Sequence, residues 1–267
     1  MENLLARPGK NKRNNKMKTR IILLMAALFP QTLWAAEIPA TLQWSQRVEL
    51  STPVSGVVQS VNVEVGDRVI KGQVLLKLDS TVYRARVAGN QSEITRLNAE
   101  AEEAKRDLKR VQELYERTVV STSDLDQAKL HMIKSRAALS EARERLRQNQ
   151  KVLDDATLRA PFDAVVVLRE AEPGQSVAAG LQPQMLLTLA RAGEMIARAG
   201  LSLPQVDKLR AGQTLTVSIA GTDYTGKIKT LGMEPSKING EWVYPVDVVF
   251  PSKGTLRAGT PAQLKLP

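Results

Sequence analysis

A short motif occurs twice in this chain, and a long segment with a different pattern separates the two copies. The copies span residues 52–72 and 160–180. Four positions recur at a constant spacing of 108 residues: Pro53 and Pro161, Gly66 and Gly174, Val69 and Val177, Gly72 and Gly180. An internal repeat of turn and strand residues marks a repeated structural unit. The copies are therefore interpreted as two half-units of one small β domain.

Each half-unit has the pattern of a half-buried strand that ends in a glycine turn. Residues 61–65 alternate valine with polar residues, which gives the predicted strand one apolar face. Gly66 and Gly174 begin turn dipeptides in which a positive φ is expected. The strand after the motif repeats as well, at residues 74–78 and 185–189. This arrangement resembles a flattened barrel of the biotinyl/lipoyl type, split into two halves.

The segment between the halves carries an apolar heptad repeat that favours a helical hairpin. In residues 81–117 the seam positions are Val87, Ile94, Ala101, Leu108 and Tyr115, alternating with Asn90, Leu97, Ala104 and Val111. A break at residues 118–123 is followed by a second register: Leu125, Met132, Leu139, Leu146 and Leu153, with Ala128, Ser135 and Ala142. Strict seven-residue spacing predicts a coiled coil, and the short break makes the helices antiparallel. Asp79 or Ser80 is expected to cap the first helix, which would reach about 55 Å. A coiled coil that pairs two copies of the chain is the alternative.

The remainder of the chain returns to a β pattern. Strands are expected at residues 195–201, 214–220, 224–232, 242–250 and 263–266, and one or two helical turns at residues 203–213. Short strands between glycine and proline turns predict a small barrel. Within it, residues 223–228 are expected to form a solvent-edged strand without assigned chemistry.

The predicted fold class is mixed α and β and elongated: a split lipoyl-like β domain, an inserted antiparallel coiled-coil hairpin and a small β-barrel. The expected divisions are an export signal at 1–36, a leading strand or linker at 37–50, the lipoyl-like halves at 51–79 and 157–190, the hairpin at 80–156 and the barrel at 191–267.

The first 36 residues have the composition of an export signal. Lys16, Lys18 and Arg20 precede the apolar run of residues 21–29, and a cleavage site is expected after Ala35 or Ala36. Met17 offers a second start, which would make residues 1–16 an upstream extension. An uncleaved membrane anchor is the alternative, although a membrane span needs about 20 apolar residues.

Charge and chemistry-bearing residues argue against nucleic-acid binding and catalysis. The net charge is +10, but the first 36 residues supply +6 of it, and aromatic residues make up only 4% of the chain. The chain has no cysteine and a single histidine, His131, which lies off the heptad seam. Asp154 and Asp155 are interpreted as surface charges at a helix end. We therefore expect no enzyme activity, no metal site, no cofactor and no nucleic-acid partner.

Three stretches of the chain are similar to the periplasmic adaptor, or membrane fusion protein, family of tripartite efflux pumps. They are residues 53–58 with 65–69, residues 158–163, and residues 256–261. The resemblance, which points to the RND type, implies a periplasmic protein at the inner membrane that links a transporter to an outer-membrane channel. It also implies self-association in the assembled pump and a role in drug resistance.

The resemblance also implies a site at the hairpin tip. Arg110, Leu114 and Ser121 have the spacing of the Arg/Leu/Ser motif with which adaptors of this family contact the outer-membrane channel. The chain departs from the family in three respects: Ala164 replaces a glycine at an expected turn, the membrane-proximal domain is not evident, and there is no cysteine for lipid modification.

Two other functions remain open at this point. A biotinyl or lipoyl carrier would be modified on a lysine, and Lys71 and Lys77 lie nearest the expected position. The chain is also consistent with an adaptor for an ABC-type exporter. The exported substrate is not indicated by the sequence.

Overall fold

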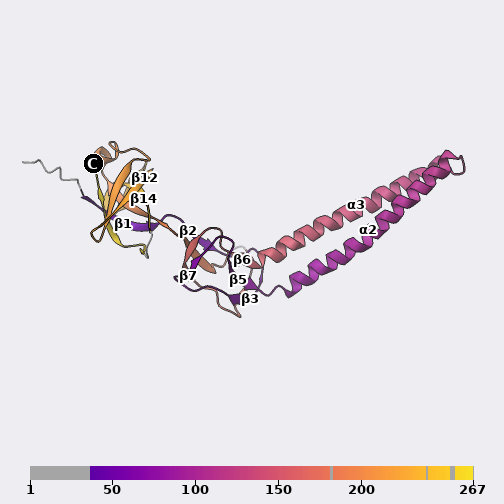
Figure 1. Ribbon diagram of the computed structural model, residues 1–267, viewed down its shortest axis with the longest axis horizontal. Coiled ribbons are helices and arrows are strands. Elements are labelled where there is room, and N and C mark those ends of the chain that lie inside the picture. Colours follow the sequence, from indigo (N-terminus) through magenta and orange to yellow (C-terminus); the bar gives the residue numbers. More distant parts are fainter. Residues whose placement is uncertain (1–36, 181–182, 239, 253–255, 267) are drawn as a thin grey trace, which may run out of the picture.

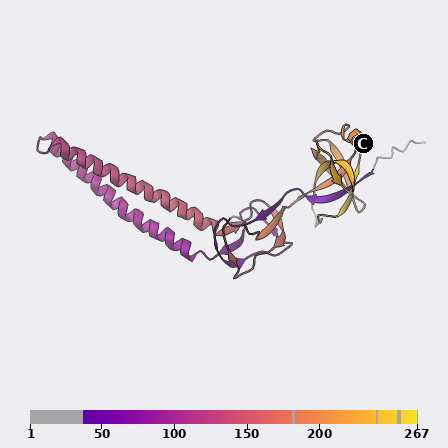
Figure 2. The ribbon, with the colours of Figure 1, turned by 180° about the vertical axis from the view of Figure 1, so that it is seen from behind.

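The computed structural model describes residues 37–180, 183–238, 240–252 and 256–266 of the 267-residue chain. It is elongated, with a β-barrel at one end, a β domain of two small sheets in the middle and a helical hairpin that projects from the other end (Figures 1 and 2). The predicted fold class is confirmed. The expected export signal lies outside the described residues and stays a prediction. Among the described residues, no helix is both long enough and apolar enough to cross a membrane.

The middle domain consists of two four-stranded sheets that correspond strand for strand. Their strands are β2 (Arg47–Leu50), β3 (Gly56–Val61), β4 (Arg68–Val69), β5 (Val74–Leu78), β6 (Thr157–Arg159), β7 (Ala164–Arg169), β8 (Ser176–Val177) and β9 (Leu187–Arg191). One sheet has the order β2-β9-β7-β4 and the other β6-β5-β3-β8. Each sheet therefore mixes strands from both half-units, so neither half can complete a sheet alone.

The backbone hydrogen bonds repeat with the motif. The amide of Gly66 donates to the carbonyl oxygen of Val166, and the amide of Gly174 donates to that of Val58, both at 2.8 Å. Gly66 and Gly174 have φ values of +98° and +88°, as the turn prediction requires. The 108-residue spacing thus relates the hydrogen-bonding pattern of the two halves as well as their sequences.

The repeat is less regular at two positions. Gly180 does not have the positive φ of its counterpart Gly72, at +84°. Ala164 was expected in a turn, but it is buried at the start of β7, just as Gly56 starts β3. That expectation is wrong because the backbone at both positions already pairs with a neighbouring strand.

The hairpin consists of α2 (Thr81–Glu116) and α3 (Thr122–Asp155). The predicted seams are confirmed along most of its length, since Leu97, Ala104, Leu139 and Ala142 are buried where the helices meet. Tyr115 differs, because it is 39% exposed. The seam is narrow, and the outer faces of the helices are covered by polar residues.

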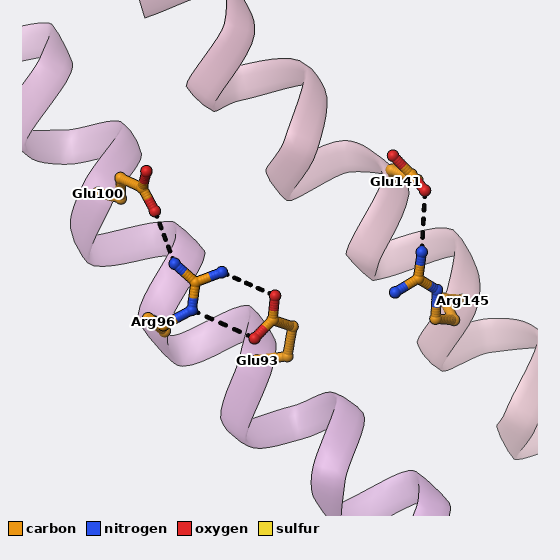
Figure 3. A network of polar contacts seen from close by, with 5 residues as sticks. All are labelled: Glu93, Arg96, Glu100, Glu141 and Arg145. Atoms are coloured by element: carbon orange, nitrogen blue, oxygen red, sulfur yellow. Dashed lines mark hydrogen bonds and ion pairs between the residues drawn. The ribbon is translucent and has the colours of Figure 1, made fainter.

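Ion pairs follow the outer faces of both helices. The guanidinium of Arg96 contacts Glu93 and Glu100, each at 2.8 Å, and Arg145 contacts Glu141 at 2.9 Å on the facing helix (Figure 3). The hydrogen bond from Arg96 lowers the pKa of Glu93, and Arg145 adds a smaller electrostatic effect. Exposed pairs of this kind stabilise a helix only slightly.

The barrel is a closed sheet in the order β10-β1-β15-β11-β12-β14-β13, with β10 also paired to β14. Its strands are β1 (Glu37–Trp44), β10 (Glu194–Leu201), β11 (Thr214–Ile219), β12 (Thr222–Leu231), β13 (Ser236–Ile238), β14 (Glu241–Pro251) and β15 (Pro261–Lys265). The core includes Leu42, Leu201, Phe250 and Leu264, each at most 1% exposed. Across the β10–β14 closure, Arg198 forms two hydrogen bonds of 2.7 and 2.8 Å with Asp247.

Two expectations about the β regions are wrong, and a third is met by its shorter form. Residues 37–50 are not a separate leading strand or linker, because β1 pairs with β10 and β15 in the barrel and β2 pairs with β9 in the middle domain. Residues 223–228 do not form an edge strand, since β12 is paired on both sides. The one or two helical turns expected at 203–213 are present as a single turn, α4 (Leu203–Val206). Long-range pairing decides the first two cases, and local sequence does not encode it.

Candidate functional site

The hairpin tip is formed by the five residues that connect α2 to α3. The break between the helices was expected at residues 118–123. It covers 117–121, because α2 ends at Glu116 and α3 begins at Thr122. The carbonyl oxygen of Leu114 accepts hydrogen bonds from the amides of Arg117 and Val119, at 3.2 and 3.0 Å. These bonds close the last turn of α2 and reverse the chain within a few residues.

Thr118 has an unusual backbone conformation in this turn. Its φ of 61° lies in the left-handed region, where β-branched residues are rarely found. Its amide is held by the carbonyl oxygen of Tyr115 at 2.9 Å. Such strained positions cost free energy and persist only where the surrounding structure enforces them. The tip is therefore a defined turn and not a frayed helix end.

Arg110 and Leu114 lie one turn apart on α2, as predicted from their spacing. The side chain of Arg110 is 73% exposed and contacts the carboxylate of Asp107 within the same helix. Leu114 is half-buried. Together they give this end of α2 one exposed cation beside a partly covered apolar side chain.

Ser121 lies across the turn from these two residues and caps α3. Its hydroxyl donates to the carboxylate of Asp124 at 2.7 Å and accepts from the Asp124 amide at 3.2 Å, and its own amide donates to the same carboxylate at 3.0 Å. These bonds form a capping box. They also lower the pKa of Asp124, chiefly through the Ser121 hydroxyl. The hydroxyl of Ser121 is thus already engaged within the hairpin.

The most exposed apolar residue of the tip was not singled out from the sequence. Val119 is 67% exposed at the apex of the turn. The sequence contains one signal for this residue: Val119 is a β-branched apolar residue within the predicted break between the two helices. Its exposure depends on the turn conformation at Thr118, which the sequence does not indicate.

The two lysines considered for a carrier function lie away from any hairpin tip of the β domain. Lys77 is within β5, which pairs with β3 on one side and β6 on the other. Lys71 lies in a turn, and its backbone amide donates a hydrogen bond of 2.8 Å to the Asp163 carboxylate. The position at which a carrier would present its lysine is occupied by the start of the helical hairpin.

Within the described part of the chain, no group of three or more histidine, cysteine or acidic side chains has the arrangement of a metal site. His131 is exposed on α3, off the seam, as predicted. The side chains at and beside the tip offer contact surface and several charges, among them Arg110, Arg117 and Asp124.

Comparison with known proteins identifies the family of this architecture. Residues 46–183, more than half of the chain, match the family model for the CzcB-like, barrel-sandwich hybrid domain. The macrolide export protein MacA of Escherichia coli O157:H7 is 28% identical over 239 residues, which cover 83% of this chain and 64% of MacA. The pyoverdine export membrane fusion protein PvdR of Pseudomonas aeruginosa is 28% identical over 214 residues, covering 74% of this chain and 55% of PvdR.

Solved structures share the fold at lower sequence identity. The membrane fusion protein Spr0693 from Streptococcus pneumoniae R6 has a TM-score of 0.69 at 17% identity, with 87% of this chain and 98% of that chain covered. MacA from Actinobacillus actinomycetemcomitans has a TM-score of 0.56 at 21% identity, with 87% and 78% covered. The chain itself spans 64% of the length of the first MacA relative. This protein belongs to the CzcB-like barrel-sandwich hybrid family, and with it to the membrane fusion, or periplasmic adaptor, proteins.

Proposed function

We propose that the chain is a non-catalytic periplasmic adaptor that links an inner-membrane transporter to an outer-membrane channel. The observation that carries this proposal is the separation of a barrel from a hairpin tip by a long rod within one chain (Figure 1). The 36 residues of α2 correspond to roughly 54 Å of helix, a length that serves reach better than core formation. Relatives named for macrolide export, pyoverdine export and multidrug resistance support export of small molecules as the process.

The tip is the proposed contact with the outer-membrane channel. Arg110 supplies a planar set of hydrogen-bond donors for carbonyl or carboxylate groups. Leu114 supplies apolar area next to it. Ser121 contributes mainly by shaping the turn, because its hydroxyl is engaged with Asp124.

Channel binding by single-residue variants tests this contact. Arg110→Asp and Leu114→Ala are expected to weaken channel capture and export, since truncation of a central contact typically costs about 1–3 kcal/mol. The matched control is Arg106→Asp, which changes an exposed arginine one turn earlier on the same helix. If both tip variants fold, capture the channel and support export like the control, the tip assignment is wrong.

The inner-membrane partner that we propose is an RND-type transporter, in assemblies that contain several copies of the adaptor. Chemical crosslinking in cells followed by mass spectrometry identifies this partner directly. Recovery of an ABC-type transporter instead would replace the RND proposal and leave the adaptor function intact.

Location is proposed as the periplasm, in association with the inner membrane. N-terminal sequencing of the protein from its host should return Ala36 or Glu37. A chain that begins at Met1 or Met17 and resists extraction from membranes would show an uncleaved anchor. A biotin or lipoyl adduct on Lys71 or Lys77 in the intact mass would instead support the carrier function.

A further inference from the structure

A groove of about 530 Å³ lies where the middle β domain meets the barrel. We call it the junction groove. Val65 and Arg68 line it from the middle domain, Leu256 and Arg257 line it from the barrel, and Trp44 lies on the connection between them. Its volume is in the range of pockets that hold one small organic molecule, and such pockets are frequent at domain interfaces.

The walls of the junction groove are mainly apolar. Val65 is 59% exposed. Trp44, Val167 and Leu256 add further apolar surface. Each of these three side chains is only partly buried, so apolar area remains open to an occupant. An apolar molecule gains free energy by covering such surface.

The charge of the groove is positive. Arg68 and Arg257 are both exposed, and neither forms an ion pair within the part of the chain that the structure describes. Arg191 is already engaged, because it donates to Gln46 at 2.6 and 3.0 Å and lies over the ring of Phe162. The same guanidinium lies 3.6 Å from Glu194, the acidic residue that lines the groove. Two arginines are therefore left for an anionic group.

We propose that the junction groove binds a small amphipathic organic anion: one aromatic or short aliphatic body with a single sulfonate, phosphate or carboxylate. Arginine binds such groups through charge-assisted hydrogen bonds, while the valine, leucine and tryptophan surfaces cover the apolar body. This site is separate from the hairpin tip and does not depend on the channel contact.

Because the junction groove lies between the barrel and the middle domain, a bound molecule should affect the angle between these two modules. Two short connections join the barrel to the middle domain, at residues 45–46 and 192–193, and Gly193 has a φ of +84°. An occupant that touches Arg68 on one side and Arg257 on the other braces the two modules against each other. Binding in the groove thereby narrows the range of angles between them.

A matched pair of fluorescent probes tests the charge requirement with the full chain. 8-Anilinonaphthalene-1-sulfonate carries the sulfonate, and N-phenyl-1-naphthylamine has the same aromatic body without it. The sulfonate probe is expected to bind about tenfold more tightly at low salt, and this advantage should shrink as salt screens the arginines. Equal affinities for the two probes would overturn the proposal.

Variants locate the binding. Arg68→Ser with Arg257→Ser should abolish the advantage of the sulfonate probe and leave the neutral probe almost unchanged. The control combines Lys208→Ser with Lys227→Ser, two exposed barrel lysines, and removes the same charge. Val65→Asp should weaken both probes. If the double-arginine variant behaves like the lysine control, the anion site is not in the groove.

Spin labels test the bracing. The chain has no cysteine, so Lys71→Cys and Lys229→Cys place one label on each module without competing thiols. The distance distribution should become narrower by about a third or more when the sulfonate probe is bound. An unchanged width at saturating probe would contradict the effect on module orientation.

Discussion

The side-chain amide of Asn149 on α3 donates a hydrogen bond of 2.7 Å to the side-chain oxygen of Asn90 on α2. Asn90 lies at a predicted seam position, and both residues are half-buried. A polar pair in such a seam stabilises less than leucine would, but it favours one register and one partner. The pair therefore explains how a narrow seam keeps a single alignment of its two helices.

Replacement of this pair by leucine should stabilise the hairpin but make the pairing of its helices less specific. Asn90→Leu with Asn149→Leu is expected to raise the melting temperature of the chain and to broaden its elution in size-exclusion chromatography, because leucine allows slipped or intermolecular pairing. Gln91→Leu with Gln148→Leu adds the same bulk at exposed neighbours and serves as the control. A double variant that is less stable and elutes as one sharp species would contradict this role.

The two symmetric glycine turns should respond equally to alanine. Gly66→Ala and Gly174→Ala each force a positive φ on a residue with a Cβ, at a cost of about 1 kcal/mol. Urea unfolding measures the loss. Gly180→Ala is the control, because that glycine has no positive φ and nothing lies within 4 Å of a Cβ there. If Gly66→Ala left the unfolding free energy unchanged while Gly174→Ala lowered it strongly, the two halves would not be structurally equivalent.

The Arg198–Asp247 pair should stabilise the barrel at its closure. The side chain of Asp247 is 10% exposed, and hydrogen bonding to this carboxylate raises the pKa of Arg198. Asp247→Ala leaves the arginine without its partner and should cost about 1–3 kcal/mol in unfolding free energy. Asp223→Ala removes an exposed partner of Lys265 and should change the melting temperature little. Equal losses of unfolding free energy in Asp247→Ala and Asp223→Ala would show that burial of the carboxylate does not determine how much the ion pair stabilises the barrel.

The capping box should make the tip sensitive to acid. The pKa of Asp124 is lowered in the folded chain, so its contribution is present above the unfolded pKa of about 3.9 and is lost as the pH falls through the lower folded value. Amide chemical shifts of Ser121 and Asp124 should change below about pH 4 and stay constant from pH 5 to 7. In Asp124→Asn this acid step should disappear. A step of the same size in that variant would assign it to another group.

The extent to which the sequence predicts this structure depends on the range of the interaction involved. The heptad seams and the positive φ at Gly66 and Gly174 are local properties, and they were predicted. The partners of β1 were not, because a strand that begins at Glu37 pairs with one that begins at Pro261. The left-handed φ of Thr118 cannot be predicted from the sequence for another reason, since β-branched residues normally avoid that region.

The same distinction applies to the candidate sites. Arg110, Leu114 and Ser121 could be located from a spacing within twelve residues of sequence, whereas the sequence did not indicate that the hydroxyl of Ser121 is occupied by Asp124. The junction groove combines Trp44, Arg68 and Arg257, which only the folded arrangement brings together. Its lining could not be recognised as a site before the two modules were placed side by side.

Photo-crosslinking from the hairpin tip tests the central claim most directly. A photoreactive amino acid at Val119, exposed at the apex, is compared in living cells with one at Glu103, which is exposed on α2 several turns before the tip. We predict an adduct between the Val119 position and an outer-membrane channel protein, with at most a trace from Glu103. Folded protein in the periplasm that yields no outer-membrane adduct from Val119, or equal yields from both positions, would contradict the proposed bridge.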